Sequence, residues 1–258
     1  MAHLRALIFD LDGTIADTER DGHRVAFNAA FREAGLDWDW EPALYGELLA
    51  VAGGKERIAA FIARHRPDLP GGTDLAAFIA GLHEAKARQF AHLLAQGGIP
   101  PRPGVARLIR EARAAGLRLA IATTAAPDTV AAVLRHGLGE GSLRWFAAIG
   151  AGEVVARKKP APDVYLWVLE QLGLDPGDCL AIEDSGPGLA AAHGAGLGTI
   201  VTVSDYTRGN DFSDAALVLS DLGEPHAPFQ VLKGDALGFG YASVATLSAW
   251  HGRLPAAA

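Results

Sequence analysis

Short apolar segments alternate with amphipathic helical patterns along most of this chain. The apolar runs lie at residues 6–9, 118–122, 146–150, 179–182 and 199–203, with a weaker one at 216–219. Two intervening segments, residues 104–116 and 162–173, place apolar side chains three and four positions apart and carry Gly or Pro at their ends. Such alternation is typical of a parallel sheet with helices on both faces. We therefore expect an α/β chain with a Rossmann-like, doubly wound parallel sheet.

One stretch interrupts this alternation. Residues 17–97 contain several helical patterns and no convincing strand, and Gly and Pro cluster at its end in the segment QGGIPPRPG, residues 96–104, as in a hinge. We expect a helical cap domain over residues 17–97, inserted into a core built from residues 1–16 and 98–230. Residues 231–258 are expected to form a C-terminal extension.

The composition excludes several classes of protein. With 23 Lys and Arg against 30 Asp and Glu, the net charge of −7 argues against a nucleic-acid scaffold or a polybasic membrane binder. Cys179 is the single cysteine, which excludes a disulfide framework and fits a reducing compartment. The sequence has no apolar run of the roughly 18 residues that span a bilayer, and its first residues lack the features of a signal peptide. We expect a cytoplasmic protein without nucleic-acid or membrane partners.

The most informative motif follows the first apolar run. Asp10 and Asp12 stand two positions apart in the segment Asp-Leu-Asp-Gly-Thr, so in an extended segment their carboxylates point to the same side. Two such carboxylates repel each other unless a cation or a proton separates them. The pair therefore suggests that one carboxylate binds metal or acts as a nucleophile while the other carries a proton. A solvated turn is the alternative interpretation.

Polar residues also follow later predicted strands. Thr123 and Thr124 come directly after residues 118–122, and hydroxyls with free backbone N–H groups can cradle a phosphate. Lys159, just before a predicted helix, can neutralise an anion, although such a basic turn is frequently only solvated. Glu183 and Asp184 offer hard oxygen ligands for Mg²⁺. Because ligands bind beyond the carboxyl ends of parallel strands, we expect these features to converge at one edge of the sheet.

A dinucleotide-binding fingerprint is a competing interpretation. Residues 186–191 match G-x-G-x-x-A between a strand and a helix, and Asp205 follows the next strand. However, Glu183 and Asp184 directly before this turn would repel a pyrophosphate, and the unit occurs late in the chain. A nicotinamide-dependent dehydrogenase is therefore the less favoured alternative.

The motifs, taken in order, resemble those of the haloacid dehalogenase (HAD) superfamily. The matching segments are Asp10-x-Asp12-Gly-Thr14, Thr123, Lys159-Pro160 and Glu183-Asp184-Ser185. The resemblance covers nearly the whole chain, including the helical insertion after the first strand. It implies a HAD core with an inserted helical cap and phosphoryl transfer through an aspartyl-phosphate.

The resemblance also implies a role for each motif residue. Asp10 would be the nucleophile, and Asp12 would protonate the leaving alcohol and then activate water. Mg²⁺ would be held by Asp10, the backbone carbonyl of Asp12 and Asp184, with Glu183 assisting.

The same resemblance assigns the transferred phosphoryl group to Thr123 and Lys159, with Thr124 and Ala125 beside them. Relatives often carry a polar Ser or Asn where this chain has Ala125-Ala126-Pro127. Backbone N–H groups would therefore replace side-chain contacts in this turn.

The cap resembles that of the CbbY-type branch, which dephosphorylates xylulose 1,5-bisphosphate, a misfire product and inhibitor of Rubisco. The segments that carry this resemblance are residues 36–40, Tyr45, residues 53–58 and residues 205–208. By resemblance, the sugar and its distal phosphate would be bound by Glu19, Tyr45, Gly54, Lys55 and Arg57. Three residues separate Glu19 from His23, one more than expected in this family. Of Trp38 and Trp40, at least one is expected in the cap core.

The resemblance therefore predicts a monomeric, Mg²⁺-dependent sugar-bisphosphate phosphatase of the Calvin cycle. Two alternatives stay open: a phosphomutase of the β-phosphoglucomutase type and a non-catalytic sugar-phosphate binder. The phosphomutase differs from the phosphatase in the fate of the aspartyl-phosphate. Water attacks this intermediate in a phosphatase, and a second sugar hydroxyl attacks it in a phosphomutase. The presence of Asp10, Asp12, Lys159 and Asp184 argues against the second, since a binder needs no nucleophile.

Overall fold

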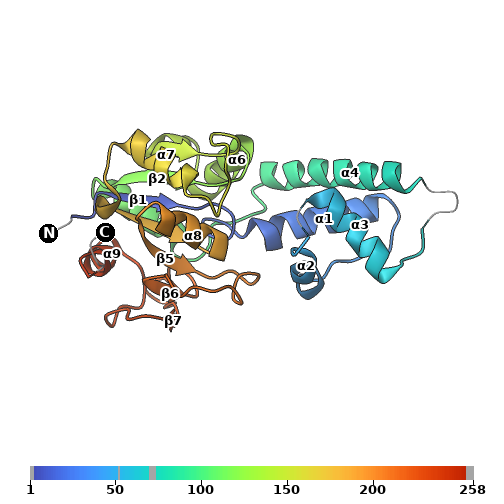
Figure 1. The fold of residues 1–258 in the computed structure, drawn as a ribbon. Helices are drawn as coiled ribbons and strands as arrows, with labels where there is room; N and C mark the ends of the chain where they lie inside the picture. Colours follow the sequence, from blue (N-terminus) through green and yellow to red (C-terminus); the bar gives the residue numbers. More distant parts are fainter. Residues whose placement is uncertain (1–2, 52, 70–73, 254–258) are drawn as a thin grey trace. The chain divides into compact units, whose positions relative to one another are not determined.

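The computed structural model describes residues 3–51, 53–69 and 74–253 (Figure 1). They divide into two compact units, one drawn from residues 1–17 and 100–258 and the other from residues 18–99. We call these the core unit and the cap unit and describe each by itself. In the part of the chain that the structure describes, no helix is both long and apolar enough to cross a membrane.

Among these residues a seven-stranded sheet forms the centre of the core unit (Figure 1). The strand order is β3-β2-β1-β4-β5-β6-β7. The strands are β1 Ala6–Phe9, β2 Arg118–Ala122, β3 Phe146–Gly150, β4 Cys179–Glu183, β5 Gly198–Thr202, β6 Leu217–Leu219 and β7 Val231–Lys233. Neighbouring strands pair in parallel except β6 and β7, which are antiparallel. The sheet confirms the predicted doubly wound α/β fold, with β1 between β2 and β4.

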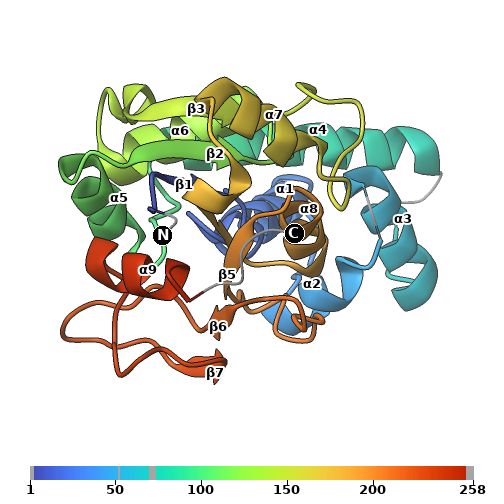
Figure 2. The ribbon, with the colours of Figure 1, turned by 60° about the vertical axis from the view of Figure 1, so that its left-hand side comes forward.

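Helices cover both faces of this sheet. The core-unit helices are α5 Val105–Ala114, α6 Pro127–Leu138, α7 Asp163–Leu172, α8 Gly186–Gly194 and α9 Val244–His251, with 3₁₀ turns at Ser142–Trp145 and Pro176–Asp178. The α7 and α8 helices pack on the face that carries Ala6 and Ile8. The α9 helix lies on the opposite face (Figure 2). There Trp250 lines a pocket with Leu180 and Ile200.

The C-terminal extension contributes two elements that the sequence patterns did not predict. All three residues of β7 are exposed, so the strand has no apolar alternation to reveal it. The α9 helix begins with a capping box in which Ser243 and Thr246 bond each other's backbone N–H groups. Residues 254–258 of the predicted extension lie outside the described residues.

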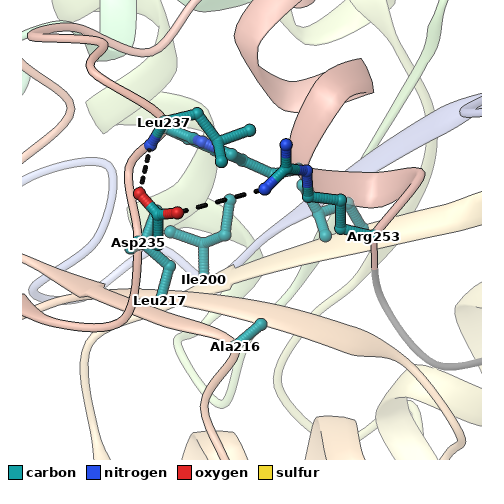
Figure 3. Close-up of a pocket in the computed structure, with 8 residues that line it drawn as sticks. Ile200, Ala216, Leu217, Asp235, Leu237 and Arg253 are labelled. Carbon is teal, nitrogen blue, oxygen red and sulfur yellow. Dashed lines mark hydrogen bonds and ion pairs between the residues drawn. The ribbon is translucent and has the colours of Figure 1, made fainter.

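A pocket of about 290 Å³ lies between the extension and the sheet (Figure 3). Its wall is mostly apolar and includes Ile200, Leu217, Leu237 and Trp250. Asp235 and Arg253 also line it and form an ion pair at 3.9 Å. The pocket contains none of the residues that the sequence analysis placed in a functional site.

All regular secondary structure in the described part of the cap unit is helical. It contains a π-helix, Thr18–His23, followed by α1 Arg24–Glu33, α2 Pro42–Leu48, α3 Gly54–His65 and α4 Leu75–Ala95. Its core is an aromatic cluster of Phe27, Phe31, Trp38, Trp40, Tyr45 and Phe61. Trp38 and Trp40 are both buried, which confirms the prediction that at least one lies in the cap core.

Candidate active site

Predicted site residues from three strands meet at the carboxyl edge of the sheet. Asp10 directly follows β1, Thr123 follows β2, and Glu183 ends β4 with Asp184 behind it. Because β2, β1 and β4 are parallel neighbours, these ends lie side by side. The backbone N–H of Asp10 donates to the carbonyl of Ile182 at 3.0 Å, which ties the loop after β1 to the end of β4.

Lys159 joins this group from the loop before α7. Its Nζ donates to Asp10 Oδ1 and to Glu183 Oε1, each at 2.6 Å. The side chains are nearly or wholly buried, at 8% exposure for Lys159, 9% for Asp10 and 0% for Glu183. A buried cation thus neutralises two buried carboxylates, the condition under which such charges are tolerated in an interior.

Tyr165 on α7 is a residue of this site that the sequence patterns missed. Its hydroxyl donates to the same Glu183 oxygen at 2.5 Å, and its ring centre lies 5.2 Å from Lys159 Nζ. In the sequence, Tyr165 falls on the apolar face of a predicted helix. The only sign that it belongs to a polar site is that a buried tyrosine hydroxyl needs a hydrogen-bond partner. Glu183 is therefore held by Lys159 and Tyr165, which makes it an anchor for the Lys159 ammonium.

Burial and crowding alter the proton affinities of this cluster. Burial raises the pKa of Asp10 well above its ordinary value; Lys159 opposes the shift, whereas Glu183, Asp184 and Asp12 add to it. Burial alone would lower the pKa of Lys159, but Asp10 and Glu183 outweigh it and the pKa is raised. The Lys159 ammonium therefore stays charged at neutral pH, while Asp10 has more negative neighbours than one lysine can offset.

Asp184 faces the same excess of negative charge. Burial and then Glu183 raise the pKa of Asp184 to about 7, against a hydrogen bond from Ser204 and the positive charge of Arg102. Asp10, Glu183 and Asp184 each offer a carboxylate oxygen, and these oxygens lie within 4.8 Å of one another. Hard oxygens at this spacing, with a surplus of negative charge, are a donor set that fits a divalent cation such as Mg²⁺.

The predicted phosphate-binding residues occupy the turn after β2. Thr123 is buried, and its backbone N–H donates to the carbonyl of Gly150 at 2.9 Å. Its Oγ1 accepts the Ala125 N–H at 3.0 Å, which closes the turn, and Thr124 is exposed. Thr123, Thr124 and Ala125 thus follow the strand next to the one that carries Asp10.

The glycines of the segment that resembles a dinucleotide-binding fingerprint are explained by local packing. They open α8, where Ser185 Oγ accepts the Gly188 N–H at 3.2 Å. A Cβ on Gly188 would collide with the Glu183 carboxylate. The glycine therefore makes room for Glu183, and no pyrophosphate is needed to explain it.

The cap unit carries a polar cluster of its own. The Tyr45 hydroxyl donates to Glu19 Oε2 at 2.6 Å and accepts from Arg57 Nη1 at 3.0 Å. Arg57 also donates to the carbonyls of Leu48 and Val51 at 3.2 and 3.3 Å. The structure thus joins three of the predicted cap residues in one hydrogen-bonded chain. The other two, Gly54 and Lys55, lie in the first turn of α3, and Lys55 is exposed.

A half-buried lysine–histidine pair lies near this cluster. Lys86 Nζ lies 2.9 Å from His23 Nδ1 and 5.1 Å from the centres of two phenylalanine rings. Burial, followed by Lys86 and Arg57, lowers the pKa of His23 to about 3, and burial lowers the pKa of Lys86 to about 8 although Glu19 opposes it. His23 is therefore neutral and accepts from the ammonium. Lys86 was missed because a lysine in an amphipathic helix resembles a solvent-facing residue.

The segment that ends at His23 is a π-helix, Thr18–His23. Its i→i+5 hydrogen bonds give each turn about one residue more than an α-helical turn. The additional residue noted between Glu19 and His23 falls within this segment. The insertion therefore coincides with a local change of helix type, and α1 begins directly after it as a regular α-helix.

Comparison with known proteins identifies one family and several similar proteins. A family model described as a haloacid dehalogenase-like hydrolase matches residues 4–196. The chain is 51% identical over 249 residues to the plasmid-encoded protein CbbY of Cupriavidus necator, covering 96% of this chain and 97% of that protein. It is 50% identical over 219 residues to protein CbbY of Rhodobacter capsulatus, covering 85% and 94%.

Solved structures similar to this chain also include CbbY proteins. CbbY from Rhodobacter sphaeroides in complex with phosphate has a TM-score of 0.68 and 45% identity, and the match covers 84% of this chain and 94% of that one. A mutant of the same protein, with the same TM-score and coverage, was solved in complex with xylulose-(1,5)bisphosphate.

Proposed function

This chain belongs to the haloacid dehalogenase-like hydrolase family and is a phosphatase, and we propose that it hydrolyses a small sugar bisphosphate, xylulose 1,5-bisphosphate, through a phosphorylated Asp10. The observation that carries the proposal is the position of Lys159, 2.6 Å from both Asp10 and Glu183 at the carboxyl edge of the sheet. A phosphate dianion that approaches Asp10 meets a carboxylate of like charge, and a fixed ammonium offsets that repulsion.

In the first half-reaction an oxygen of the Asp10 carboxylate attacks phosphorus, and the bond from phosphorus to the sugar oxygen breaks. Asp12 gives its proton to the leaving alcohol. In the second half-reaction Asp12 takes a proton from water, whose oxygen attacks phosphorus. The bond from phosphorus to the Asp10 oxygen breaks, which releases inorganic phosphate and restores the Asp10 carboxylate. Dividing the hydrolysis into two displacements lowers each barrier. Lys159 and the turn at Thr123 hold the oxygens of the transferred group.

The acidic cluster supports a requirement for Mg²⁺. Asp10 and Asp184, with the backbone carbonyl of Asp12, would hold the ion, while Glu183 is engaged by Lys159 and Tyr165. The bound ion supplies positive charge that keeps Asp10 ionised and stabilises the charge that develops on the phosphoryl oxygens. The chain's own part is to hold these carboxylates at a fixed spacing within a buried edge of the sheet.

The cap cluster supports a second anionic group on the substrate. Arg57 is held by Tyr45 and by two backbone carbonyls, so its guanidinium is fixed in place before a ligand binds. A fixed guanidinium matches phosphate geometry and loses little side-chain entropy on binding. Glu19 and the Tyr45 hydroxyl offer partners for sugar hydroxyls. We therefore propose that Glu19, Tyr45, Gly54, Lys55 and Arg57 select the sugar and its distal phosphate.

A substrate panel tests the proposal. Steady-state kcat/KM is measured over pentulose and hexose mono- and bisphosphates, with and without Mg²⁺, and both inorganic phosphate and isomeric sugar phosphates are followed. Release of phosphate with highest kcat/KM on xylulose 1,5-bisphosphate supports the proposal. An isomeric sugar phosphate as the main product would instead identify a phosphomutase. Sedimentation of the purified protein tests the proposed monomer.

A further inference from the structure

The guanidinium of Arg102 binds backbone carbonyls from three separate segments of the core unit. Its Nη1 donates to the carbonyl of Gly13 and, at 2.8 Å, to that of Thr202. Its Nη2 donates to the carbonyls of Val203 and Ser220, at 2.6 and 2.9 Å. In the sequence this arginine is part of a Gly- and Pro-rich segment that predicts only a hinge. This one half-buried side chain therefore forms hydrogen bonds with the loop after β1, the end of β5 and the end of β6.

The chemistry of these contacts requires a guanidinium. Thr202 ends β5, Val203 follows it, and Ser220 follows β6, so the carbonyls lie at the carboxyl edge of the sheet. A planar group with five N–H donors in a fixed fork can serve four carbonyls at once. A lysine ammonium offers three donors from one point and cannot span the same set.

The Gly13 carbonyl belongs to the turn that carries Asp12. Gly13 has a φ of +83°, and a Cβ at this position would collide with the Asp184 carboxylate. The turn is thus packed directly against Asp184. The backbone amides of this turn are hydrogen-bonded. The Gly13 N–H donates to the carbonyl of Ala16 at 2.8 Å, and the Ile15 N–H donates to the carbonyl of Leu11 at 2.9 Å.

Arg102 is tied to this turn a second time through its own backbone. Its N–H donates to the Ile15 carbonyl at 2.9 Å, and Pro101 forms an antiparallel bridge with Ala16. Ala16 in turn forms a bridge with Asp12. Main chain and side chain of Arg102 therefore fix both ends of the turn, and the side chain fixes it to the sheet edge.

We propose that Arg102 is a positioning residue for the reaction, which holds the Asp12–Gly13 turn against Asp184 so that Asp12 stays aligned for proton transfer. Arg102 acts through the Gly13 carbonyl and does not touch the reacting atoms. The inference rests on the proposed function, because alignment of Asp12 matters only if Asp12 transfers a proton. Displacing a catalytic group by about 1 Å can cost about 100-fold in rate.

The test compares Arg102→Ala with Arg107→Ala. Arg107 is a matched control because its guanidinium also binds two carbonyls, those of Ala242 and Gly223 at 2.7 and 2.6 Å, but anchors the C-terminal extension. Three quantities are measured: kcat, KM, and hydrogen–deuterium exchange of the amides of residues 13–16. Arg102→Ala is expected to lower kcat by about 10- to 100-fold, with KM within about threefold, and to speed this exchange. Millimolar methylguanidinium should restore part of kcat in Arg102→Ala, and Arg107→Ala should change neither kcat nor the exchange.

The outcomes are separable. Exchange at residues 13–16 that is unchanged in Arg102→Ala overturns the inference, as does faster exchange with an unchanged kcat. If Arg102→Ala does not fold, Arg102→Lys is used instead. This variant must also lower kcat and speed the exchange, both by less than is expected for Arg102→Ala. A wild-type protein without phosphatase activity would refute the proposed function, whereas the exchange data would still decide whether Arg102 holds the turn.

Discussion

The Nζ atom of Lys159 lies 2.6 Å from Oδ1 of Asp10, with both side chains at most 9% exposed. The same ammonium also binds Glu183, so a single positive charge serves two carboxylates while Asp184 adds a third nearby. The two members of the pair therefore have opposite effects on the cluster. Removing the carboxylate relieves repulsion, and removing the ammonium increases it.

Asp10→Asn is expected to abolish turnover, lowering kcat by at least about 10⁴-fold, because an amide is a poor nucleophile. Folding should be retained, with a thermal midpoint equal to or above that of the wild type, since one of the crowded carboxylates is gone. Phosphate release and circular dichroism melting check both expectations. Asp175→Asn, an exposed carboxylate near the amino end of β4, is the control. Residual activity near the wild-type rate would refute the role of Asp10 as nucleophile.

Lys159→Met is expected to destabilise the fold as well as to stop turnover. The substitution leaves Asp10 and Glu183 buried without their cation, and breaking a buried ion pair in this way costs about 3–5 kcal/mol. Urea unfolding at neutral pH measures the loss. An unfolding free energy within about 1 kcal/mol of the wild type would show that other groups neutralise the cluster.

Chelation is expected to stop activity, and Mg²⁺ is expected to stabilise the folded protein. The ion binds the native cluster and not the unfolded chain, so a concentration of 100 Kd adds about 2.7 kcal/mol of stability. The rise in thermal midpoint with Mg²⁺ should disappear in Asp184→Asn and persist in Asp175→Asn. Full turnover in excess EDTA would contradict the metal assignment.

Arg57→Ala is expected to discriminate between substrates by their number of phosphate groups. Loss of its charge-assisted hydrogen bonds should lower kcat/KM for a sugar bisphosphate by about 10- to 100-fold. The corresponding monophosphate, which lacks the distal group, should lose less than about threefold by the same reasoning. Arg57→Lys serves as the conservative control, and its loss of kcat/KM for the bisphosphate should lie between these two values. Equal losses on both substrates would show that Arg57 does not meet the distal phosphate.

Stability is expected to depend on pH through His23. Its pKa is about 3 in the folded protein against 6.5 for an unperturbed histidine, so between these values the unfolded chain binds more protons. The free energy of unfolding should therefore fall as the pH decreases from 6.5 towards 3, by up to about 1.4 kcal/mol per pH unit from this group. Urea unfolding at several pH values measures the slope. His23→Gln should flatten it, and an unchanged slope in this variant would assign the dependence to other groups.

The sequence predicted those parts of the fold and site that follow from repeating patterns. The buried strands that end in Asp10 and Glu183 and the helices at 105–114 and 163–172 came from apolar periodicity, and the convergence of strand ends followed from parallel pairing. The β7 strand has three exposed residues and no such pattern. Sequence also gave no sign of where polar side chains on helices point.

Three residues, two on helices and one in a loop, show that sequence patterns do not reveal the partners of polar side chains. Tyr165 and Lys86 occupy positions that periodicity assigns to packing or to solvent, and their hydrogen bonds to Glu183 and His23 depend on tertiary contacts. Arg102 stands among prolines and a glycine, which predicts a break in secondary structure and nothing about four carbonyl partners. Local patterns specify elements, whereas contacts between distant segments appear only once the chain has folded.

The antiparallel bridge between Ala16 and Pro101 also bears on how such a chain can be rebuilt. The segment that leaves the core and the segment that returns to it are paired at the exit point, so residues 18–99 form an insert between two adjacent backbone positions. A short turn should be able to close the same gap, as it does between paired strands. The insert is thus exchangeable in principle, and a chimera that carries a different insert would still contain Asp10, Lys159 and Glu183, all of which belong to the core unit.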